Sequence, residues 1–421
     1  MNRIGKAALA AAAVALAGPA LATNGMRMTG FGAVQNGMGG VGVGATLDAS
    51  AAISNPAGLT ELGRRLDVNF TWFQPSVDYK ATGIAPPFVN QAGATLSSDR
   101  GGSPIPNLGV VVPLGGGFTA GLGAFGVGGM GVDYKANLYS GTSLTSYQNM
   151  RVAPAIAWKA NDLFSAGLAV NVMWGQMKYD VASGFGQVKH DTANAYGYGA
   201  TLGVKVTPMK ELSFGLAYES KSFFGSYEFD IPSHQVPDGQ GGAVTVPGGK
   251  DQLDFDQPAV ISGGVAYRPV PALLLALDVQ WINWSDTNGD KKPVYENNTQ
   301  LTGALPFDMG WEDQVVVKLG AAFDVAPSFT VRAGWNYGKM PLDAARAFEN
   351  IVFPAIAEHH VSLGLGWAAT PTLAVNAGVT YSPKAKLSGA NASPPPGGQG
   401  LVSYETTMSQ FAADLGLGWT F

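Results

Sequence analysis

Apolar and polar residues alternate along several stretches of the chain. In one of them the apolar residues stand at odd positions, namely Phe329, Val331, Ala333, Trp335 and Tyr337. The same period of two recurs in the ranges 164–174, 314–324 and 372–381. Because neighbouring side chains of a β-strand point to opposite faces, each stretch predicts a strand with one apolar and one polar face.

The connections between such stretches are of two kinds. Six are short turns rich in Pro, Gly or Asn-Asp, near Pro113 to Gly117, Ala160 to Leu163, Pro208 to Glu211, Pro269 to Ala272, Ala326 to Ser328 and Thr370 to Thr372. Seven are long and polar, in the ranges 81–105, 132–149, 182–194, 231–251, 285–311, 339–357 and 386–407. Thirteen connections join fourteen strands, and short turns alternating with long loops are typical of outer-membrane barrels. The sequence thus predicts an all-β fold, a 14-stranded antiparallel transmembrane β-barrel with both ends in the periplasm.

Charge and composition support a barrel. Only 13% of the residues are charged, against roughly 25% in soluble globular proteins. After the first 22 residues no uncharged run is long and apolar enough for a spanning helix. A Lys or Arg on the lipid face would cost about 2–4 kcal/mol, so Lys205, Arg268, Lys318 and Arg332 should face the lumen. The net charge of −5 and the lack of a basic patch give no reason to expect a nucleic acid partner.

Both ends of the chain carry export features. Residues 1–22 combine Arg3 and Lys6, an uncharged run and small residues at Ala20 and Ala22, which predicts a signal peptide cleaved before Thr23. The absence of cysteine agrees with an exported protein that uses no disulfides. The last strand ends on Phe421, which resembles the C-terminal signature recognised by the barrel-assembly machinery; the alternative is an ordinary edge strand.

The residues that follow the leader form neither a barrel strand nor a domain of their own. The stretch from Thr23 to Leu59 is rich in glycine and poor in charge, and it contains a short helical pattern at 48–52 before Pro56. About 37 residues cannot bury a core alone, so this stretch needs walls supplied by the rest of the chain. We predict that residues 23–63 are a plug (hatch) inside the lumen of a barrel formed by residues 64–421.

The plug also carries a resemblance. An Asn-Gly start, the block Gly37-Met38-Gly39-Gly40-Val41-Gly42-Val43, the turns at Asp48-Ala49-Ser50-Ala51 and the ending Asn55-Pro56-Ala57 resemble the hatch of the FadL family. These are bacterial outer-membrane transporters of long-chain fatty acids and other hydrophobic compounds. The resemblance implies an integral outer-membrane channel without a cofactor, which meets outer-membrane lipids and lipopolysaccharide. A monomer is expected.

A glycine-rich stretch falls in the third predicted strand, with Gly121, Gly123, Gly126, Gly128 and Gly129. Part of it matches a dinucleotide-binding pattern, but no helix follows, so a nucleotide site is not predicted. Glycine this dense favours a bend or bulge. The resemblance implies an inward kink of the third strand that opens a gap in the barrel wall for lateral release. The alternative is that small residues let the plug pack closely.

Candidate binding residues follow from the same picture. Apolar plug residues suited to a hydrophobic ligand are Met26, Met28, Phe31, Met38, Leu47 and Ile53, each of which ordinary packing explains equally well. Candidate anchors for a carboxylate are Arg151, Lys205, Lys318 and Arg332, unless they pair with Asp67, Glu219, Asp278 or Asp414. The resemblance implies an extracellular landing surface at Phe185, Phe223, Phe224 and Tyr227. We also expect Asn55, Pro56 and Ala57 to hold the plug against the third strand.

The remaining motifs predict no further chemistry. Asp286, Asn288 and Asp290 have the spacing of a calcium loop, but Lys291 and Lys292 follow where oxygen ligands are needed. The four histidines show no metal-binding spacing, and a hydrolytic triad is not expected. The hypothesis is passive uptake of long-chain fatty acids or other hydrophobic compounds, such as alkanes or aromatic hydrocarbons, by a protein that is not an enzyme. The solute would be captured outside, enter an apolar pocket in the lumen and leave through the gap at the third strand. A general hydrophilic porin and an outer-membrane lipid hydrolase are the alternatives.

Overall fold

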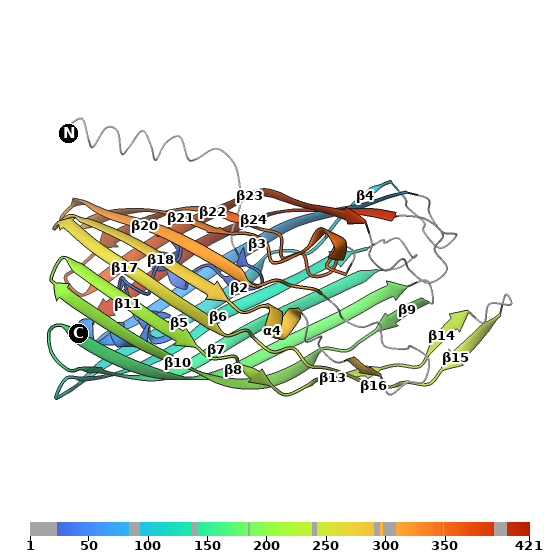
Figure 1. The fold of residues 1–421 in the computed structure, drawn as a ribbon, viewed down its shortest axis with the longest axis horizontal. Coiled ribbons are helices and arrows are strands. Elements are labelled where there is room, and N and C mark those ends of the chain that lie inside the picture. The colour runs from blue at the N-terminus through green and yellow to red at the C-terminus, as the bar shows by residue number, and fades with distance from the viewer. Residues whose placement is uncertain are drawn as a thin grey trace.

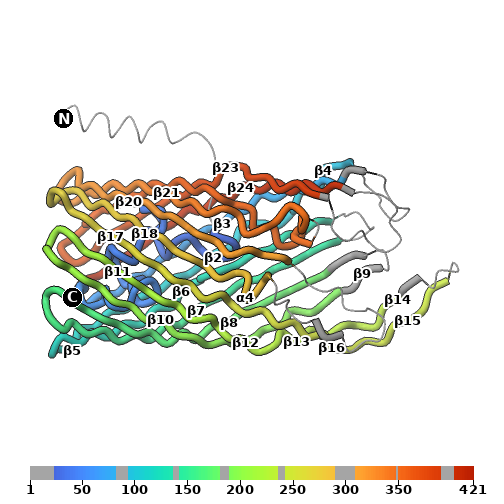
Figure 2. The backbone as a smooth tube through the Cα atoms, in the orientation of Figure 1, coloured from blue at the N-terminus to red at the C-terminus, as the bar shows by residue number. Residues whose placement is uncertain are grey.

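The computed structural model describes residues 23–83, 93–135, 142–183, 186–237, 242–289, 295–297, 309–347, 349–390 and 402–421. The predicted signal peptide lies outside these residues. Within them, fourteen long strands form one antiparallel sheet (Figures 1 and 2). They are β3 (Arg65–Gly83), β5 (Ser103–Gly115), β6 (Phe118–Tyr134), β7 (Ser143–Lys159), β8 (Phe164–Ser183), β10 (Ala193–Met209), β11 (Leu212–Glu219), β17 (Val260–Val270), β18 (Leu273–Ile282), β20 (Gln314–Ala326), β21 (Phe329–Gly338), β22 (His359–Ala368), β23 (Leu373–Ala390) and β24 (Val402–Thr420).

The sheet closes on itself. The last strand, β24, pairs with the first, β3, from Thr420 opposite Arg65 to Val402 opposite Gly83. This confirms the predicted closed barrel of fourteen antiparallel strands, counted over the described residues. Closure removes the free edges that would otherwise expose unpaired backbone groups to lipid.

The six short turns all join neighbouring strands as predicted, and they gather at the end of the barrel where the C-terminus lies (Figure 1). Several long connections differ from the prediction. In the range 386–407, for example, β23 continues to Ala390 and β24 begins at Val402. The range 132–149 is mostly strand, because β6 continues to Tyr134 and β7 begins at Ser143. The connection predicted at 231–251 is longer, because β11 already ends at Glu219 and β17 begins at Val260. In the 132–149 connection and in the one after β11, the chain packs against an aromatic core beyond the apolar band. A period of two does not distinguish a strand over this core from a strand that spans the membrane.

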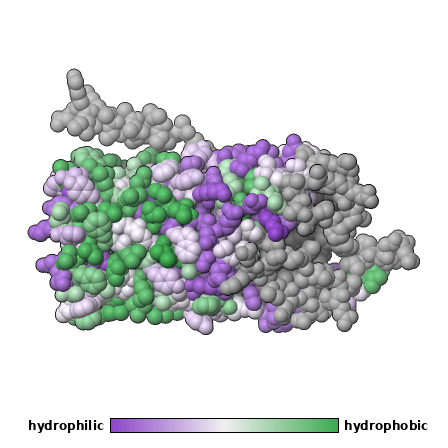
Figure 3. Space-filling view, viewed as in Figure 1, coloured by the Kyte–Doolittle hydropathy of each residue, from purple (hydrophilic) through white to green (hydrophobic). Residues whose placement is uncertain are grey.

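On the face seen in Figure 3, an apolar band covers the half of the barrel near the turns, and a hydrophilic zone borders it. Outward-facing residues in this band include Phe70, Leu168, Val170 and Val172, each at least 40% exposed. Such a band is what a barrel presents to lipid. Among the described residues, no helix has the length and apolar character needed to cross a membrane.

The plug lies inside the same half of the barrel (Figure 1). Its elements are β1 (Thr23–Asn24), β2 (Arg27–Met28), α2 (Gly32–Asn36), α3 (Ala51–Ser54) and η1 (Pro56–Glu61), and most of its residues are buried. Glycines make this fit possible: a Cβ at Gly39, which has φ 69°, would lie 2.7 Å from the Leu319 carbonyl oxygen. On the wall, a Cβ at Gly334 would lie 1.9 Å from the Gly39 nitrogen. Plug and wall therefore meet backbone to backbone.

The loop end carries short elements of its own. They are β4 (Thr95–Ser97), β9 (Gly186–Lys189), β12 (Phe223–Phe224), β13 (Tyr227–Ile231), β14 (His234–Pro237), β15 (Ala243–Val246), β16 (Gly249–Leu253), α4 (Ser285–Asn288), β19 (Tyr295–Asn297) and η2 (Ala344–Arg346). Beneath them Tyr147, Tyr227, Phe255 and Phe353 are buried and in ring contact. This aromatic core lies above the plug and explains why the strands extend beyond the apolar band.

Candidate functional site

The third barrel strand, β6, separates from its neighbour β5 midway along the wall. The two strands pair from Gly115 opposite Phe118 to Asn107 opposite Phe125, and the described pairing ends there. Beyond that point the range 103–106 of β5 pairs with β3 alone. On its other side β6 has an irregular register against β7 between Gly126 and Gly128. The strand therefore kinks where the glycines concentrate, and a window opens between β5 and β6.

Two local features explain the separation. Pro104 and Pro106 lack the backbone N–H that a ladder requires, and prolines in sheets occur on edges or at bulges. The plug supplies a substitute partner for the freed edge of β6, since Arg27 of β2 pairs with Gly128. The Gly129 N–H also donates to the Met26 carbonyl oxygen at 3.0 Å. The kinked strand thus pairs with the plug instead of with β5.

A cavity of about 360 Å³ lies at this window. Its lining includes inward-facing wall residues such as Tyr147 and Asn149, and their outward-facing neighbours Gln148 and Met150. Thr23, Gly25 and Met28 of the plug also contribute, as do Phe73, Pro75, Val77, Arg100, Ser103, Pro104, Ile105, Pro106, Gly126, Gly128, Gly129, Met130, Gly131, Trp174, Pro354, Met408 and Gln410. Residues of both faces of the barrel wall therefore line this cavity.

The predicted glycine group divides into two parts. Gly121 and Gly123 pair regularly on both sides, and a Cβ on either would approach Leu59 or Ile53 of the plug. These two glycines fit the alternative that small residues let the plug pack closely. Gly126, Gly128 and Gly129 lie at the kink and line the cavity.

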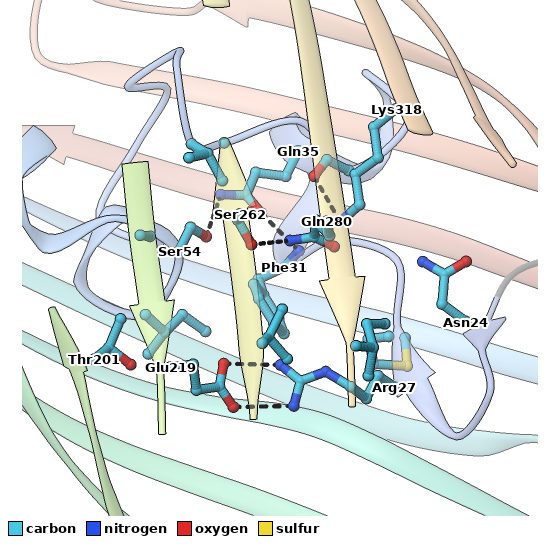
Figure 4. A pocket seen from close by; sticks show the side chains of 18 residues that line it. Asn24, Arg27, Phe31, Gln35, Ser54, Thr201, Glu219, Ser262, Gln280 and Lys318 are labelled. Carbon is cyan, nitrogen blue, oxygen red and sulfur yellow. Dashed lines mark hydrogen bonds and ion pairs between the residues drawn. The ribbon is translucent and has the colours of Figure 1, made fainter. Parts of the chain in front are cut away.

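The four predicted carboxylate anchors differ in their surroundings. Arg151 is fully buried and binds Glu219, which also takes a two-pronged ion pair from Arg27 of the plug at 2.8 and 2.9 Å (Figure 4). Lys205 pairs with Glu61 of the plug at 2.6 Å. Both cations therefore hold carboxylates of the protein itself, and Glu219 ties plug to wall.

Lys318 and Arg332 also face the lumen, as the alternation predicts. The Lys318 ammonium donates to the carbonyl oxygens of Thr29 at 2.7 Å and Gly40 at 3.3 Å, so it serves the plug backbone. The Arg332 Nη1 is buried without a hydrogen-bond partner among the described residues. Arg268 lies exposed near the turn end of β17.

Asp278 of β18 holds the glycine-rich segment of the plug. One of its oxygens accepts from Gly42 N at 2.7 Å and Val43 N at 2.9 Å, and the other accepts from Gly44 N at 3.2 Å. Asp278 is fully buried. Three successive N–H groups around one carboxylate form an anion-binding nest, and here the anion is a side chain of the wall. This role of Asp278 is absent from the sequence prediction, because nothing local marks which lumen carboxylate meets the plug.

The Asn55-Pro56-Ala57 segment lies elsewhere than predicted. The Asn55 amide donates to Val43 O at 2.9 Å within the plug and to Val204 O of β10 at 3.2 Å. Ser165 of β8 donates to Ala57 O at 3.3 Å. The prediction that this segment contacts the third strand is wrong: it lies against β8 and β10, where Gly167 and Gly203 leave room for it. Leu59 of η1, two residues further on, is the residue that meets β6 at Gly121.

Of the six predicted apolar ligand residues, three line a cavity and three are packed in hydrophobic clusters. Met28 lines the window cavity. Met28, Phe31 and Ile53 line a smaller polar cavity of about 40 Å³ between plug and wall, shown in Figure 4. Met26, Met38 and Leu47 pack in hydrophobic clusters with residues of the wall, and the cluster of Met26 also includes the aromatic core at the loop end. For these last three the packing alternative holds.

The predicted landing surface is only partly exposed. Phe223 is 51% exposed and lies beside the outward-facing Tyr198. Phe224 is half-buried, and Phe185 lies outside the described residues. The prediction for Tyr227 is wrong, since this residue is fully buried against Tyr147 and Phe224.

Comparisons with known proteins agree with this architecture. A search of curated proteins found no match. Among solved structures, the Pseudomonas putida toluene transporter TodX is 19% identical, with a TM-score of 0.75, and the match covers 95% of this chain and 100% of TodX. A Pseudomonas aeruginosa FadL homologue is 17% identical at TM-score 0.77, covering 94% and 100%. The Ralstonia pickettii toluene transporter TbuX is 18% identical at TM-score 0.72, covering 93% and 99%. At these identities the likeness shows a shared fold.

A family model shows more than the fold. The model described as outer membrane protein transport protein (OMPP1/FadL/TodX) matches residues 8–412, which is nearly the whole chain. Its match agrees with the closed barrel, the apolar band and the N-terminal plug described above. The chain therefore belongs to the OMPP1/FadL/TodX family of outer-membrane transport proteins, which are integral membrane channels and not enzymes.

Proposed function

We propose that the protein takes up hydrophobic compounds passively and releases them sideways into the outer membrane through the window between β5 and β6. The observation that carries this proposal is the cavity lined by residues of both faces of the wall. A straight path through the barrel is filled by the buried plug, which Asp278 and Glu219 tie to the wall. The side window is therefore the shorter route for an apolar solute.

The lining of the cavity supports an apolar solute. Phe73, Ile105, Met130 and Met150 contribute apolar surface, and methionine adapts to ligands of different shape. Transfer of an apolar chain from water to such a site gains about 0.8 kcal/mol per buried CH₂. The TodX and TbuX structures are described as toluene transporters, which makes toluene a reasonable probe. Other partners that we propose are outer-membrane lipids, lipopolysaccharide and the barrel-assembly machinery.

The test is uptake of radiolabelled toluene and oleate by cells that lack their own transporters and produce this protein. Valine at Gly126 and Gly128 should block the window, since a Cβ at Gly126 would lie 2.3 Å from Ile105 Cγ2 and one at Gly128 would lie 2.9 Å from Met26 O. We expect uptake of transported probes to fall about tenfold or more in this double variant.

Gly263→Val is the matched control, because a Cβ at Gly263 meets no atom within 4 Å. It should leave uptake unchanged. Normal uptake by a correctly folded Gly126→Val/Gly128→Val variant would overturn lateral release. Deleting residues 24–57 separates a plugged transporter from a hydrophilic porin, since only the former should become leaky to polar solutes.

A further inference from the structure

The window cavity contains one charged side chain among the described residues that line it, Arg100. Arg100 stands in the connection just before β5 and is half-buried. Its Nη1 donates to the Thr145 carbonyl oxygen at 3.3 Å, and it belongs to none of the ion pairs found among the described residues. A guanidinium has five N–H donors, so most of its donors remain available.

The surroundings of Arg100 leave room for an anion. Asp133 acts on Arg100 electrostatically but forms no ion pair with it: Asp133 Oδ2 is bound by Lys135, and the buried Oδ1 has no hydrogen-bond partner among the described residues. The Asp99 side chain is exposed, and its backbone N–H donates to Asp133 O. Burial lowers the pKa of Arg100 from its ordinary value, with Asp133 acting in the opposite direction. Arginine nevertheless stays protonated, so a charge without a bound carboxylate stands at the edge of an otherwise uncharged cavity.

The position of this charge within the cavity matters. A Cβ at Gly131 would lie 2.9 Å from Arg100 Nη1, so the guanidinium lies beside Gly131 on the kinked strand. Gly126, where the window begins, is five residues nearer the turn end of the same strand, which corresponds to about 16 Å. Met130 and Met150 also line the cavity. The cavity thus combines a cationic end toward the loops with apolar walls.

We propose that Arg100 is a specificity-determining residue that binds the anionic head group of an amphiphilic solute at the window, with the apolar tail lying along the kinked strand. A carboxylate suits this role, because guanidinium and carboxylate form paired hydrogen bonds. Among the described residues, no other lumen cation lines the window cavity. Arg27 and Arg151 also bind Glu219, and Lys205 binds Glu61. This inference rests on the proposed lateral release.

The experiment compares two probes that differ only in the head group, radiolabelled oleate and oleyl alcohol. Uptake of each is measured with the wild type, Arg100→Gln and Arg100→Lys. We expect Arg100→Gln to lower oleate uptake about tenfold, because a hydrogen-bonded charge pair is lost, and to leave oleyl alcohol uptake unchanged. Arg100→Lys should restore part of the oleate uptake, because it keeps the charge but not the planar donor pair.

Four other results are distinguishable, and they bear on the role of Arg100 or on the proposed function. Equal losses for both probes would show that Arg100 only supports the fold of the window and would overturn the inference. Unchanged oleate uptake in Arg100→Gln would overturn it as well. If the wild type takes up oleyl alcohol but not oleate, head-group binding fails while the proposed function stands. If it takes up neither of these probes nor toluene, the proposed function itself fails.

Discussion

Replacing Asp278 by alanine should release the plug from the wall while leaving the barrel closed. The carboxylate is fully buried and accepts three hydrogen bonds from the consecutive N–H groups of Gly42, Val43 and Gly44, at 2.7, 2.9 and 3.2 Å. Asp278 lies in the middle of β18, where the strand pairs on both sides. Its side chain contributes nothing to those backbone ladders, so the substitution acts on the plug.

The size of the effect follows from the lost hydrogen bonds. A hydrogen bond to a charged group contributes about 1.5–3 kcal/mol, and the three bonds share one carboxylate, so a total near 3 kcal/mol is a conservative estimate. Since about 1.4 kcal/mol is a factor of ten, the ratio of released to seated plug should rise about 100-fold. Lys318 lies opposite Asp278 and would lose its nearest acidic neighbour, which adds to the loss.

Single-channel conductance in planar lipid bilayers is the appropriate assay, because a released plug opens an aqueous path. The Asp278→Ala protein should show frequent openings that the wild type shows rarely. Asp324→Ala is the matched control, since Asp324 lies on the neighbouring strand and its side chain, among the described residues, accepts a hydrogen bond from Thr330 at the turn end and none from the plug. Wild-type conductance in a folded Asp278→Ala barrel would refute the reasoning that this carboxylate holds the plug.

Three further predictions concern the leader, the Asn55 segment and pH. The mature protein should begin at Thr23; intact-mass measurement that finds residues 1–22 retained would contradict this. Gly203→Val should displace the plug and raise conductance, because a Cβ there would lie 2.1 Å from Asn55 Oδ1, whereas Gly263→Val should not; equal conductance of the two variants would count against it. Burial, together with the charge of Asp67, raises the pKa of Asp48 in the plug to about 6. Between about pH 4 and pH 6 the seated plug therefore keeps a proton on Asp48 that the released plug loses. Seating of the plug thus weakens as the pH rises from about 4 to above 6. Asp48→Asn should therefore reduce the difference in conductance between about pH 5 and about pH 7.5, and an unchanged difference would argue against Asp48 as its source.

The barrel could be predicted from the sequence because its signals are local. A period of two and a Pro-, Gly- or Asn-containing turn are each read within about ten residues, and all six short turns proved correct. The ends of the long strands could not be predicted in this way. Tyr134, Thr145 and Tyr147 continue the alternation into the aromatic core, and local pattern does not reveal where lipid gives way to that core.

Contacts between the plug and the wall depend on which strands face which plug residue, and this is a property of the closed barrel. The plug sequence indicates that Asn55 and Pro56 form a tight turn but does not reveal that β8 and β10 lie beside it. The same holds for Asp278, which is one lumen carboxylate among several. Pro104 and Pro106 are a local signal for the window, since two prolines at alternate positions weaken the hydrogen-bond ladder of a sheet. The predicted loop 81–105 contains Pro104, so the prediction makes no use of this signal.

The most direct test of lateral release is a disulfide across the window. The chain has no cysteine, and a Cβ at Gly126 would lie 3.7 Å from the Ile105 Cβ, which is within the range a disulfide requires. The Ile105→Cys/Gly126→Cys protein should take up the transported probe poorly when oxidised and regain uptake after reduction, with both single-cysteine variants unaffected by either treatment. Undiminished uptake with the disulfide fully formed would contradict release between β5 and β6.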